Sequence, residues 1–391
     1  MVKVLGLTGA DAAAEAMRQI HPDVVAAYPI TPQTGIVQTY STYVADGVVD
    51  TEMVTVESEH SAMSCVVGAA AAGARAMTAT SANGLALMFE IVYIAASYRL
   101  PIVAAVVNRA LSGPINIHCD HSDSMGCRDS GWIQLISENT QETYDNMIQA
   151  VRIGEHSDVL LPVMVTLDGF IISHVMERLE VLDDNVAKDF VGTYKPLYPL
   201  LDTENPVTYG PLDLTDYYFE HKRQQYEGMA NAGRIIKEIG KLYGDLTGRY
   251  YSLLELYKME DAEYALVTLG STSGTAKFLI DEMRAEGKKV GLIKVRSFRP
   301  FPVQDLIDAC KKLKGLAVLD RSISFGAEGG PVFIEVKSAF YGSGLKLPVI
   351  NYIYGLGGRD ITPTELRIPF DNLVKLSSGA RFEPVQFLGL R

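Results

Sequence analysis

Short apolar segments alternate with longer helical segments through about the first 180 residues of the chain. They predict, among other elements, a short N-terminal strand, a strand at residues 76–80, a turn at Asn83-Gly84 and a helix at residues 85–97. The most informative segment is residues 101–107 (PIVAAVV), in which every side chain is apolar. A strand that is apolar on both faces is typical of a parallel sheet covered by helices on both sides. The alternation of such strands with helices therefore predicts an α/β fold with a doubly wound sheet.

A second unit of the same kind is predicted toward the C-terminus. It contains three apolar strands with helices between them, which predict a smaller parallel sheet: residues 264–269, 290–295 and 315–319. The stretch before it contains four prolines, which break helices, followed by a polar helix at about residues 215–243. With 391 residues the chain can bury two cores. We therefore predict two domains and a connector: residues 1–185, a connector at 186–250, and residues 251–391.

The charge pattern argues against a nucleic-acid-binding protein. The formal net charge is −12, and Lys and Arg form no cluster suited to a phosphate backbone. No apolar run approaches the roughly 20 residues that cross a bilayer, and the beginning of the chain lacks the layout of a signal peptide. We expect a cytoplasmic protein.

The cysteines offer no metal-binding motif. None of the four forms a C-x-x-C pair, so we expect no iron–sulfur cluster and no structural zinc in this chain. Residues 118–129 contain two histidines, two cysteines and three aspartates, but residues adjacent along a chain cannot all turn toward one ion. We predict a hydrogen-bonded loop there, which lines a substrate pocket or a subunit interface.

Two segments that follow predicted strands could bind a ligand. Thr31 lies in Tyr28-Pro-Ile-Thr-Pro32, where two prolines stiffen the turn, although a threonine here could equally cap the next helix. Glu59 precedes a helix at about residues 61–74 that is rich in Ala and Gly. The helix dipole favours an acid at this end. A helix with so little side-chain bulk, however, lets a cofactor or another helix come close. Both interpretations of Glu59 stay open.

A third candidate pair, Asn108 and Arg109, follows the apolar strand at residues 101–107. A buried arginine is costly unless its charge is matched. Its natural partner is a carboxylate, which belongs either to the protein, as an internal salt bridge, or to a bound substrate. The glycine-containing loop at residues 270–277 lacks the spacing of a P-loop or a dinucleotide-binding motif, and it predicts a plain strand-to-helix turn.

These segments and others occur together, in order, over nearly the whole chain. As a set they resemble the alpha subunit of multi-subunit pyruvate:ferredoxin oxidoreductases, the pyruvate synthases. The segments are Tyr28-Pro-Ile-Thr-Pro32, Glu57-Ser-Glu-His60, Thr78-Ala-Thr-Ser81, Gly84-Leu-Ala-Leu-Met88, Leu100-Pro-Ile-Val103, Asn108-Arg-Ala110, Asp120-His-Ser-Asp123, Gly131-Trp-Ile-Gln134, Leu167-Asp-Gly-Phe170, Gly274-Thr-Ala-Lys277, Phe298-Arg-Pro-Phe-Pro302 and Gly355-Leu-Gly-Gly-Arg-Asp360.

The resemblance implies a thiamine diphosphate pyrimidine-binding domain and a transketolase C-terminal-like domain. It implies that Glu59 contacts the aminopyrimidine ring of thiamine diphosphate, where a carboxylate at the ring nitrogen N1′ promotes removal of the thiazolium proton. Pro29 and Ile30 would also contact the cofactor. Arg109 would pair with the carboxylate of a 2-oxoacid, with Thr31 and Asn108 as further substrate-binding residues.

The resemblance also implies what other chains supply. No G-D-G motif with a following asparagine is present, so a beta subunit would hold the diphosphate and its Mg²⁺. Gamma and ferredoxin-like delta subunits would carry iron–sulfur clusters, coenzyme A would accept the acyl group, and an external ferredoxin would accept the electrons. This chain would be active only within that assembly.

Three other interpretations remain at this stage. The substrate could be another 2-oxoacid, such as 2-oxoglutarate, a branched-chain oxoacid or oxalate, although Thr31 beside Arg109 suits a small methyl-bearing one. The chain could also be a non-catalytic assembly subunit, with its small-residue helix serving only to bind a partner. A nucleotide-binding dehydrogenase is disfavoured because the glycine fingerprint is missing.

Overall fold

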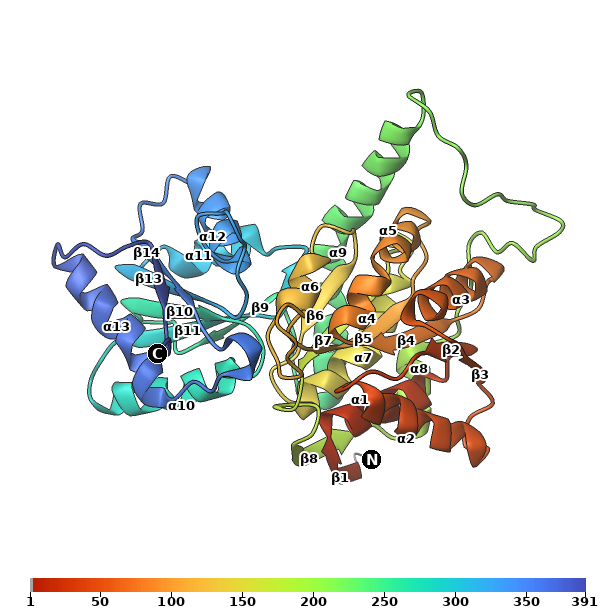
Figure 1. Ribbon diagram of the computed structural model, residues 1–391, viewed down its shortest axis with the longest axis horizontal. Coiled ribbons are helices and arrows are strands. Elements are labelled where there is room, and N and C mark those ends of the chain that lie inside the picture. Colours follow the sequence, from red (N-terminus) through yellow and green to blue (C-terminus); the bar gives the residue numbers. More distant parts are fainter. Residues whose placement is uncertain (1–2) are drawn as a thin grey trace.

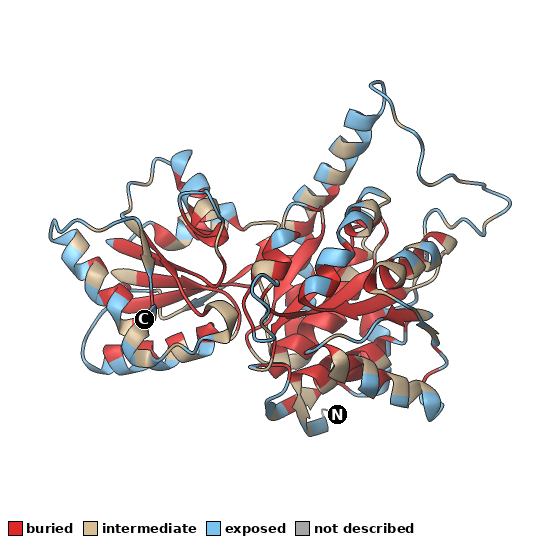
Figure 2. Cartoon of the chain, viewed as in Figure 1, coloured by how far each residue is buried: buried red, intermediate tan, exposed pale blue. Residues whose placement is uncertain are grey.

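The computed structural model describes residues 3–391. Figure 1 shows two α/β lobes side by side, with a long loop and a long helix standing out from the larger one. We call residues 3–247 the large lobe and residues 254–391 the small lobe. Figure 2 shows that the strands of both lobes lie in the buried interior. The predicted α/β fold is confirmed. The predicted domain boundaries stay a prediction.

The large lobe is built on a seven-stranded sheet with the order β12-β6-β7-β5-β4-β2-β3. Its strands are parallel except β12, which comes from the small lobe and runs antiparallel to β6. The strands are β2 (Val24–Ala27), β3 (Glu52–Thr55), β4 (Ala76–Thr80), β5 (Val103–Asn108), β6 (Ile133–Ile136), β7 (Val163–Asp168) and β12 (Ser297–Arg299).

Helices cover both faces of this sheet, as the continuous apolar strand at residues 101–107 predicts. Val25 packs in the hydrophobic cluster of one face and its neighbour Ala26 in that of the other, as successive residues of a strand must. On one face lie α1 (Gly9–Ile20), α2 (Thr34–Ala45), α7 (Thr140–Gly154), α8 (Asp184–Val191) and the C-terminal part of α9 (Tyr218–Thr247). On the other lie α3 (Glu59–Ala72), α4 (Ala82–Leu87) and α5 (Phe89–Ser97).

The small lobe contains a six-stranded sheet with the order β15-β14-β13-β10-β11-β9, so the expectation of three strands was too low. Only β9 is antiparallel to its neighbour. The strands are β9 (Leu254–Tyr257), β10 (Tyr264–Thr268), β11 (Val290–Val295), β13 (Gly315–Asp320), β14 (Val349–Ile353) and β15 (Val385–Phe387). The helices are α10 (Thr272–Ala285), α11 (Val303–Cys310), α12 (Pro331–Tyr341), η1 (Leu356–Gly358) and α13 (Pro363–Ser377).

Three smaller elements complete the large lobe. The predicted N-terminal strand is β1 (Lys3–Thr8), which pairs with β8 (Met176–Val181) in a separate two-stranded sheet. The short helix α6 (Ser122–Gly126) lies within the polar segment at residues 118–129.

A turn was expected at Asn83 and Gly84, but both lie inside α4. Across residues 3–391, no helix combines the length and hydrophobicity needed to cross a bilayer.

Candidate active site

The predicted site residues lie after parallel strands that end at one edge of the large sheet. Thr31 follows β2, Glu59 follows β3, and Arg109 follows β5. The ends of β4 and β7, which are Thr80 and Asp168, reach the same edge. Open parallel sheets bind their ligands at the carboxyl ends of their strands. The topology therefore gathers side chains that are far apart in sequence.

Glu59 is a buried carboxylate without a partner. It is the first residue of α3, whose N-terminus is capped by the Ser58 hydroxyl, which accepts a hydrogen bond from the Ser61 N–H at 3.2 Å. Its side chain lies against Gly84, where a Cβ would stand 2.8 Å from Glu59 Oε1. Glu59 is only 7% exposed, yet it makes no side-chain hydrogen bond or ion pair to any described residue. The carboxylate oxygens are therefore left for water or for a donor that a ligand or another chain supplies.

The end of β4 adds two further polar groups that lack partners. Thr80 Oγ1 and Ser81 Oγ are both buried and make no hydrogen bond within the part of the chain that the structure describes. Thr80 lies beside Glu59, because a Cβ at Gly84 would also stand 2.7 Å from Thr80 Oγ1. Unsatisfied buried hydroxyls are uncommon in proteins, and an ordered water or a bound ligand would satisfy these two. Residues 78–81 are among the segments that carry the family resemblance, but their sequence alone predicts no role for Thr80 or Ser81.

Arg109 and Thr31 are in direct contact. Arg109 Nη1 donates a hydrogen bond to the Thr31 carbonyl oxygen at 2.9 Å, and Nε donates to the Asn116 carbonyl oxygen at 3.0 Å. The guanidinium is almost fully buried, and no acidic side chain within residues 3–391 forms an ion pair with it. The alternative of an internal salt bridge is therefore wrong. The hydroxyl of Thr31 is not a helix cap either, because α2 begins at Thr34 with Gln33 as its N-cap.

Asn108 lies behind these groups, fully buried. Its Nδ2 donates to Asp123 Oδ1 at 2.7 Å and to Ser124 Oγ at 2.9 Å. Asp123 Oδ2 accepts from the N–H groups of Arg109 and Ala82, both at 3.0 Å, so one carboxylate joins the segment of Arg109 to the start of α4. Burial raises the pKa of Asp123 to about 6, although these hydrogen bonds lower it. Asn108 and Asp123 thus fix the spacing between Arg109 and the helix that carries Gly84.

Asp168 joins the two lobes. Its Oδ1 contacts His121 Nε2 at 2.8 Å, and its Oδ2 accepts from the Ser271 N–H at 3.1 Å and from Arg321 Nη1 at 3.2 Å. The Asp168 carboxylate therefore lies at the N-terminus of α10, the place where the glycine-containing turn could otherwise bind an external anion. Cys119, His121 and Asp168 also place potential ligand atoms within 4.8 Å of one another. The hydrogen-bonded loop predicted at residues 118–129 is observed, and it lies against the small lobe.

Asp168→Asn is expected to lower the free energy of unfolding by about 3–5 kcal/mol, because it leaves the buried Arg321 guanidinium without its counter-charge. Burial alone would raise the pKa of Asp168, but His121, Arg321 and Ser271 outweigh it and hold this pKa well below its ordinary value. A depressed pKa stabilises the fold above the ordinary value of 3.8 and less so as the pH falls below it. The difference in unfolding free energy between the wild type and the variant should therefore be constant down to about pH 4 and shrink below it.

Denaturant titration of the isolated chain at several pH values measures this difference. Asp261→Asn serves as the control, because Asp261 is an exposed partner of Arg284 and its loss should cost under about 1 kcal/mol. Equal unfolding free energies for the two variants at pH 7 would contradict the role of Asp168.

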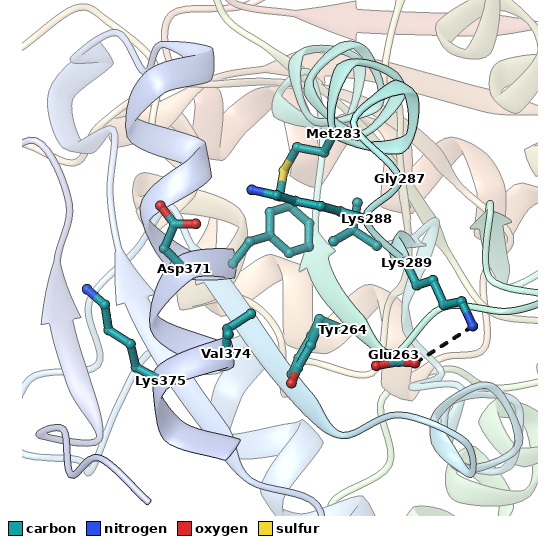
Figure 3. Close-up of a pocket in the computed structure, with 11 residues that line it drawn as sticks. Glu263, Tyr264, Met283, Gly287, Lys288, Lys289, Asp371, Val374 and Lys375 are labelled. Carbon is teal, nitrogen blue, oxygen red and sulfur yellow. Dashed lines mark ion pairs between the residues drawn. The ribbon is translucent and has the colours of Figure 1, made fainter. Parts of the chain in front are cut away.

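One cavity borders the carboxyl edge of the large sheet, where the candidate site lies, and another lies away from it in the small lobe. A cleft of about 790 Å³ between the lobes is lined by Ala110 and Asn116, the neighbours of Arg109, and by Ser324 and Gly357 of the small lobe. Figure 3 shows another pocket, of about 610 Å³, between α10 and α13 of the small lobe, where Lys289 pairs with Glu263. It lies at the amino ends of β10 and β11, opposite to the edge where parallel sheets bind ligands, so we assign it no role in the site.

Comparisons with known proteins agree with this arrangement. A family model described as "Pyruvate flavodoxin/ferredoxin oxidoreductase, thiamine diP-bdg" matches residues 15–241, and one described as "Pyruvate:ferredoxin oxidoreductase core domain II" matches residues 262–366. The pyruvate synthase subunit PorA of Thermotoga maritima is 61% identical over 100% of this chain and 99% of that protein. PorA of Methanocaldococcus jannaschii is 46% identical over 96% of each chain.

Other relatives extend the comparison. The ketoisovalerate oxidoreductase subunit VorA of Pyrococcus horikoshii is 42% identical over 96% of this chain and 95% of that protein. The solved structure of a 2-oxoglutarate:ferredoxin oxidoreductase from Magnetococcus marinus superposes on this chain with a TM-score of 0.71 at 20% sequence identity. The superposition covers 95% of this chain and 65% of that one, and it shows that the two share a fold. A split-gene transketolase shares the fold more distantly, with a TM-score of 0.56 at 13% identity, covering 97% of this chain and 100% of that one. The chain therefore belongs to the pyruvate:ferredoxin oxidoreductase family, among the alpha subunits that include the PorA chains of pyruvate synthases.

Proposed function

We propose that this chain binds the pyrimidine half of thiamine diphosphate and the carboxylate of pyruvate, in an enzyme that forms acetyl-CoA, CO₂ and reduced ferredoxin, or runs in reverse. The observation that carries the proposal is the buried Glu59 carboxylate, which has no partner within residues 3–391. When bound, thiamine diphosphate supplies the electron sink that allows a 2-oxoacid to lose CO₂. The residues described below bind and orient the reactants.

Glu59 is the proposed catalytic residue at the cofactor. Its carboxylate would share a proton with the ring nitrogen N1′, which is a task for an acid held at a fixed point in a water-poor site. Gly84 permits this position because it places no side chain against Glu59. The hydroxyls of Thr80 and Ser81 are available to hydrogen-bond the exocyclic amino group of the same ring. Pro29 and Ile30, in the loop after β2, would pack against its apolar edge.

Arg109 and Thr31 are the proposed substrate-binding residues. The guanidinium charge of Arg109 is unmatched by any acid among the described residues, so a substrate carboxylate would supply the missing counter-charge. The Thr31 hydroxyl would donate a hydrogen bond to the same substrate. Asn108 is proposed to act on substrate binding through Asp123, since its own side chain is fully buried.

The remaining components would belong to partner subunits. A beta subunit would hold the diphosphate and Mg²⁺, and gamma and delta subunits would carry iron–sulfur clusters that pass electrons to an external ferredoxin. The cysteines of this chain support that division, because Cys119, Cys127 and Cys310 are buried singly in the described structure and Cys65 lies on α3. Coenzyme A would accept the acyl group, and the cytoplasm would be the compartment.

A substrate panel tests the proposal. The complex assembled on this chain should reduce ferredoxin with a higher kcat/KM for pyruvate than for 2-oxoglutarate or ketoisovalerate. The reason is that Arg109 offers one unmatched positive charge for one carboxylate, with the small Thr31 beside it. A preference for ketoisovalerate would instead place the chain functionally with the VorA relative, and no activity with any 2-oxoacid would support a non-catalytic role.

Gly84→Ala should weaken the site although it leaves every proposed catalytic residue unsubstituted. A Cβ at this position would push Glu59 or Thr80 aside, and a displacement of a catalytic group by about 1 Å can cost about 10²-fold in rate. We expect a lower kcat and a higher Kd for thiamine diphosphate, measured by steady-state kinetics and calorimetry on the assembled complex. Gly342→Ala is the control, because its Cβ would meet nothing within 4 Å. Wild-type kinetics for both variants would contradict the position of Glu59.

A further inference from the structure

One part of the large lobe projects into solvent with an apolar surface. We call residues 196–227 the arm. It consists of the loop that leads into α9 and the first turns of that helix, which stand away from the lobe in Figure 1. Figure 2 shows that the arm is mostly exposed along its length. The first buried residue of α9 is Gly228, and the nearly three turns before it contact the lobe where Arg99 Nη1 donates a hydrogen bond to the Gln224 carbonyl oxygen at 2.9 Å.

The exposed side chains of the arm are large and apolar. Leu212 is 89% exposed, Phe219 77% and Leu201 76%, and Leu214, Tyr217 and Tyr226 are also mostly exposed. Single exposed apolar residues are ordinary, but a concentrated group of this kind indicates an interaction surface. Aromatic residues are also enriched where proteins bind one another. A helical segment of this length is only marginally stable without packing, so the arm would gain stability from a partner.

The arm is attached to the C-terminal ends of α3 and α5, and in α3 this is the end opposite to Glu59. The Leu200 N–H donates to the Ala71 carbonyl oxygen near the C-terminal end of α3 at 2.8 Å. The Tyr209 ring packs on Tyr98, which follows α5, with 5.7 Å between ring centroids. Helix α3 begins at Glu59 itself. The outer side of α4 and α5 continues the apolar surface, because Leu87, Phe89 and Tyr93 are exposed.

We propose that the arm docks on the subunit that supplies the diphosphate half of the cofactor site. This inference rests on the proposed function, in which a second chain covers Glu59. The second chain has to sit on the layer formed by α3, α4 and α5, because helices of the present chain already cover the opposite layer. In that opposite layer, α7 is buried over nearly its whole length and packs against α9. The arm leaves this layer at the C-terminal ends of α3 and α5, so a chain that covers the layer along the whole of α3, from Glu59 to Ala71, also reaches the arm.

Site-specific photo-crosslinking in the intact complex tests the proposal. A benzoylphenylalanine at position 212 should crosslink to the chain that contains the G-D-G motif with a following asparagine, as identified by mass spectrometry of the joined peptides. The same probe at Tyr341, which is 95% exposed on the small lobe, should not give that product. Crosslinks from position 212 to a second copy of this chain or to another subunit, or no crosslink at all, would overturn the proposal.

A pair of charged variants tests the energetic part. The double variant Leu212→Asp with Phe219→Asp should weaken binding of the same subunit by at least about 30-fold, because each buried apolar anchor of an interface contributes substantially to affinity. The variant Tyr341→Asp with Leu390→Asp, at sites that are 95% and 72% exposed, should bind as the wild type does. Circular dichroism and the Tm of the isolated chain check that both variants fold. Unchanged binding by the folded arm variant would overturn the proposal.

The two proposals fail separately. Glu59→Gln leaves the arm intact, so a Glu59→Gln complex that assembles normally but keeps full activity would remove the proposed function and spare the arm. A folded arm variant that assembles and turns over like the wild type would remove the arm proposal and spare the active site.

Discussion

Glu59→Gln in the assembled complex is expected to lower kcat by about 10²- to 10⁴-fold, the usual contribution of a positioned acid or base. The substitution keeps the size of the side chain and its place against Gly84, but it removes the acidic group that would share a proton with the cofactor ring. Binding of thiamine diphosphate should weaken less than kcat, because the amide still offers a hydrogen bond. Steady-state ferredoxin reduction and calorimetry of cofactor binding measure the two effects.

Glu57→Gln is a matched control for this experiment. Glu57 lies two residues away, at the surface, and its carboxylate accepts a hydrogen bond from the Ser61 hydroxyl. Its substitution should leave kcat within about twofold of the wild type, as expected for a surface change of under about 0.5 kcal/mol. Activity of Glu59→Gln close to that of Glu57→Gln would remove Glu59 from the catalytic machinery.

Arg109→Gln should lower kcat/KM for pyruvate by about 30- to 5,000-fold, mainly through a higher KM. Truncating one partner of a buried, hydrogen-bonded charge pair costs about 2–5 kcal/mol, and the substrate carboxylate would be the other partner. Arg109→Lys should recover part of the loss, since it restores the charge but not the planar guanidinium. Initial rates over a range of pyruvate concentrations give both parameters.

The same Arg109 side chain also binds two backbone carbonyl groups, so a control for local disorder is needed. The KM for coenzyme A and the Tm of the complex should stay close to their wild-type values if the loss concerns the substrate carboxylate. A pyruvate KM that is unchanged in Arg109→Gln would contradict the assignment.

The sequence predicted the elements whose interactions are mainly local. The strand at residues 76–80 and the strand at residues 290–295 have the predicted bounds, because each is a short β-type segment bounded by residues that favour turns. The expectation of a turn at Asn83 and Gly84 was wrong because the same residues fit a helix that Asp123 anchors through the Ala82 N–H. β9 and β12 were also missed, since each is a short strand placed by pairing with a distant strand.

The candidate site was predictable as a set of residue types but not as a set of contacts. Sequence position after a strand marked Thr31, Glu59 and Arg109 as candidates, and the family resemblance supplied their expected roles. The proximity of Thr80 and Gly84 to Glu59, and the link of Asp168 to Ser271 and Arg321, depend on packing between segments that are distant in sequence. For Arg109, only the structure separates an internal salt bridge from an unmatched charge.

A structure of the assembled complex with thiamine diphosphate bound tests the central claim most directly. The account predicts that a carboxylate oxygen of Glu59 lies within hydrogen-bond distance of the ring nitrogen N1′, with Gly84 behind it. A ring nitrogen held by an acid of another chain, with Glu59 turned toward neighbouring protein, would contradict the claim that this chain forms half of the active site.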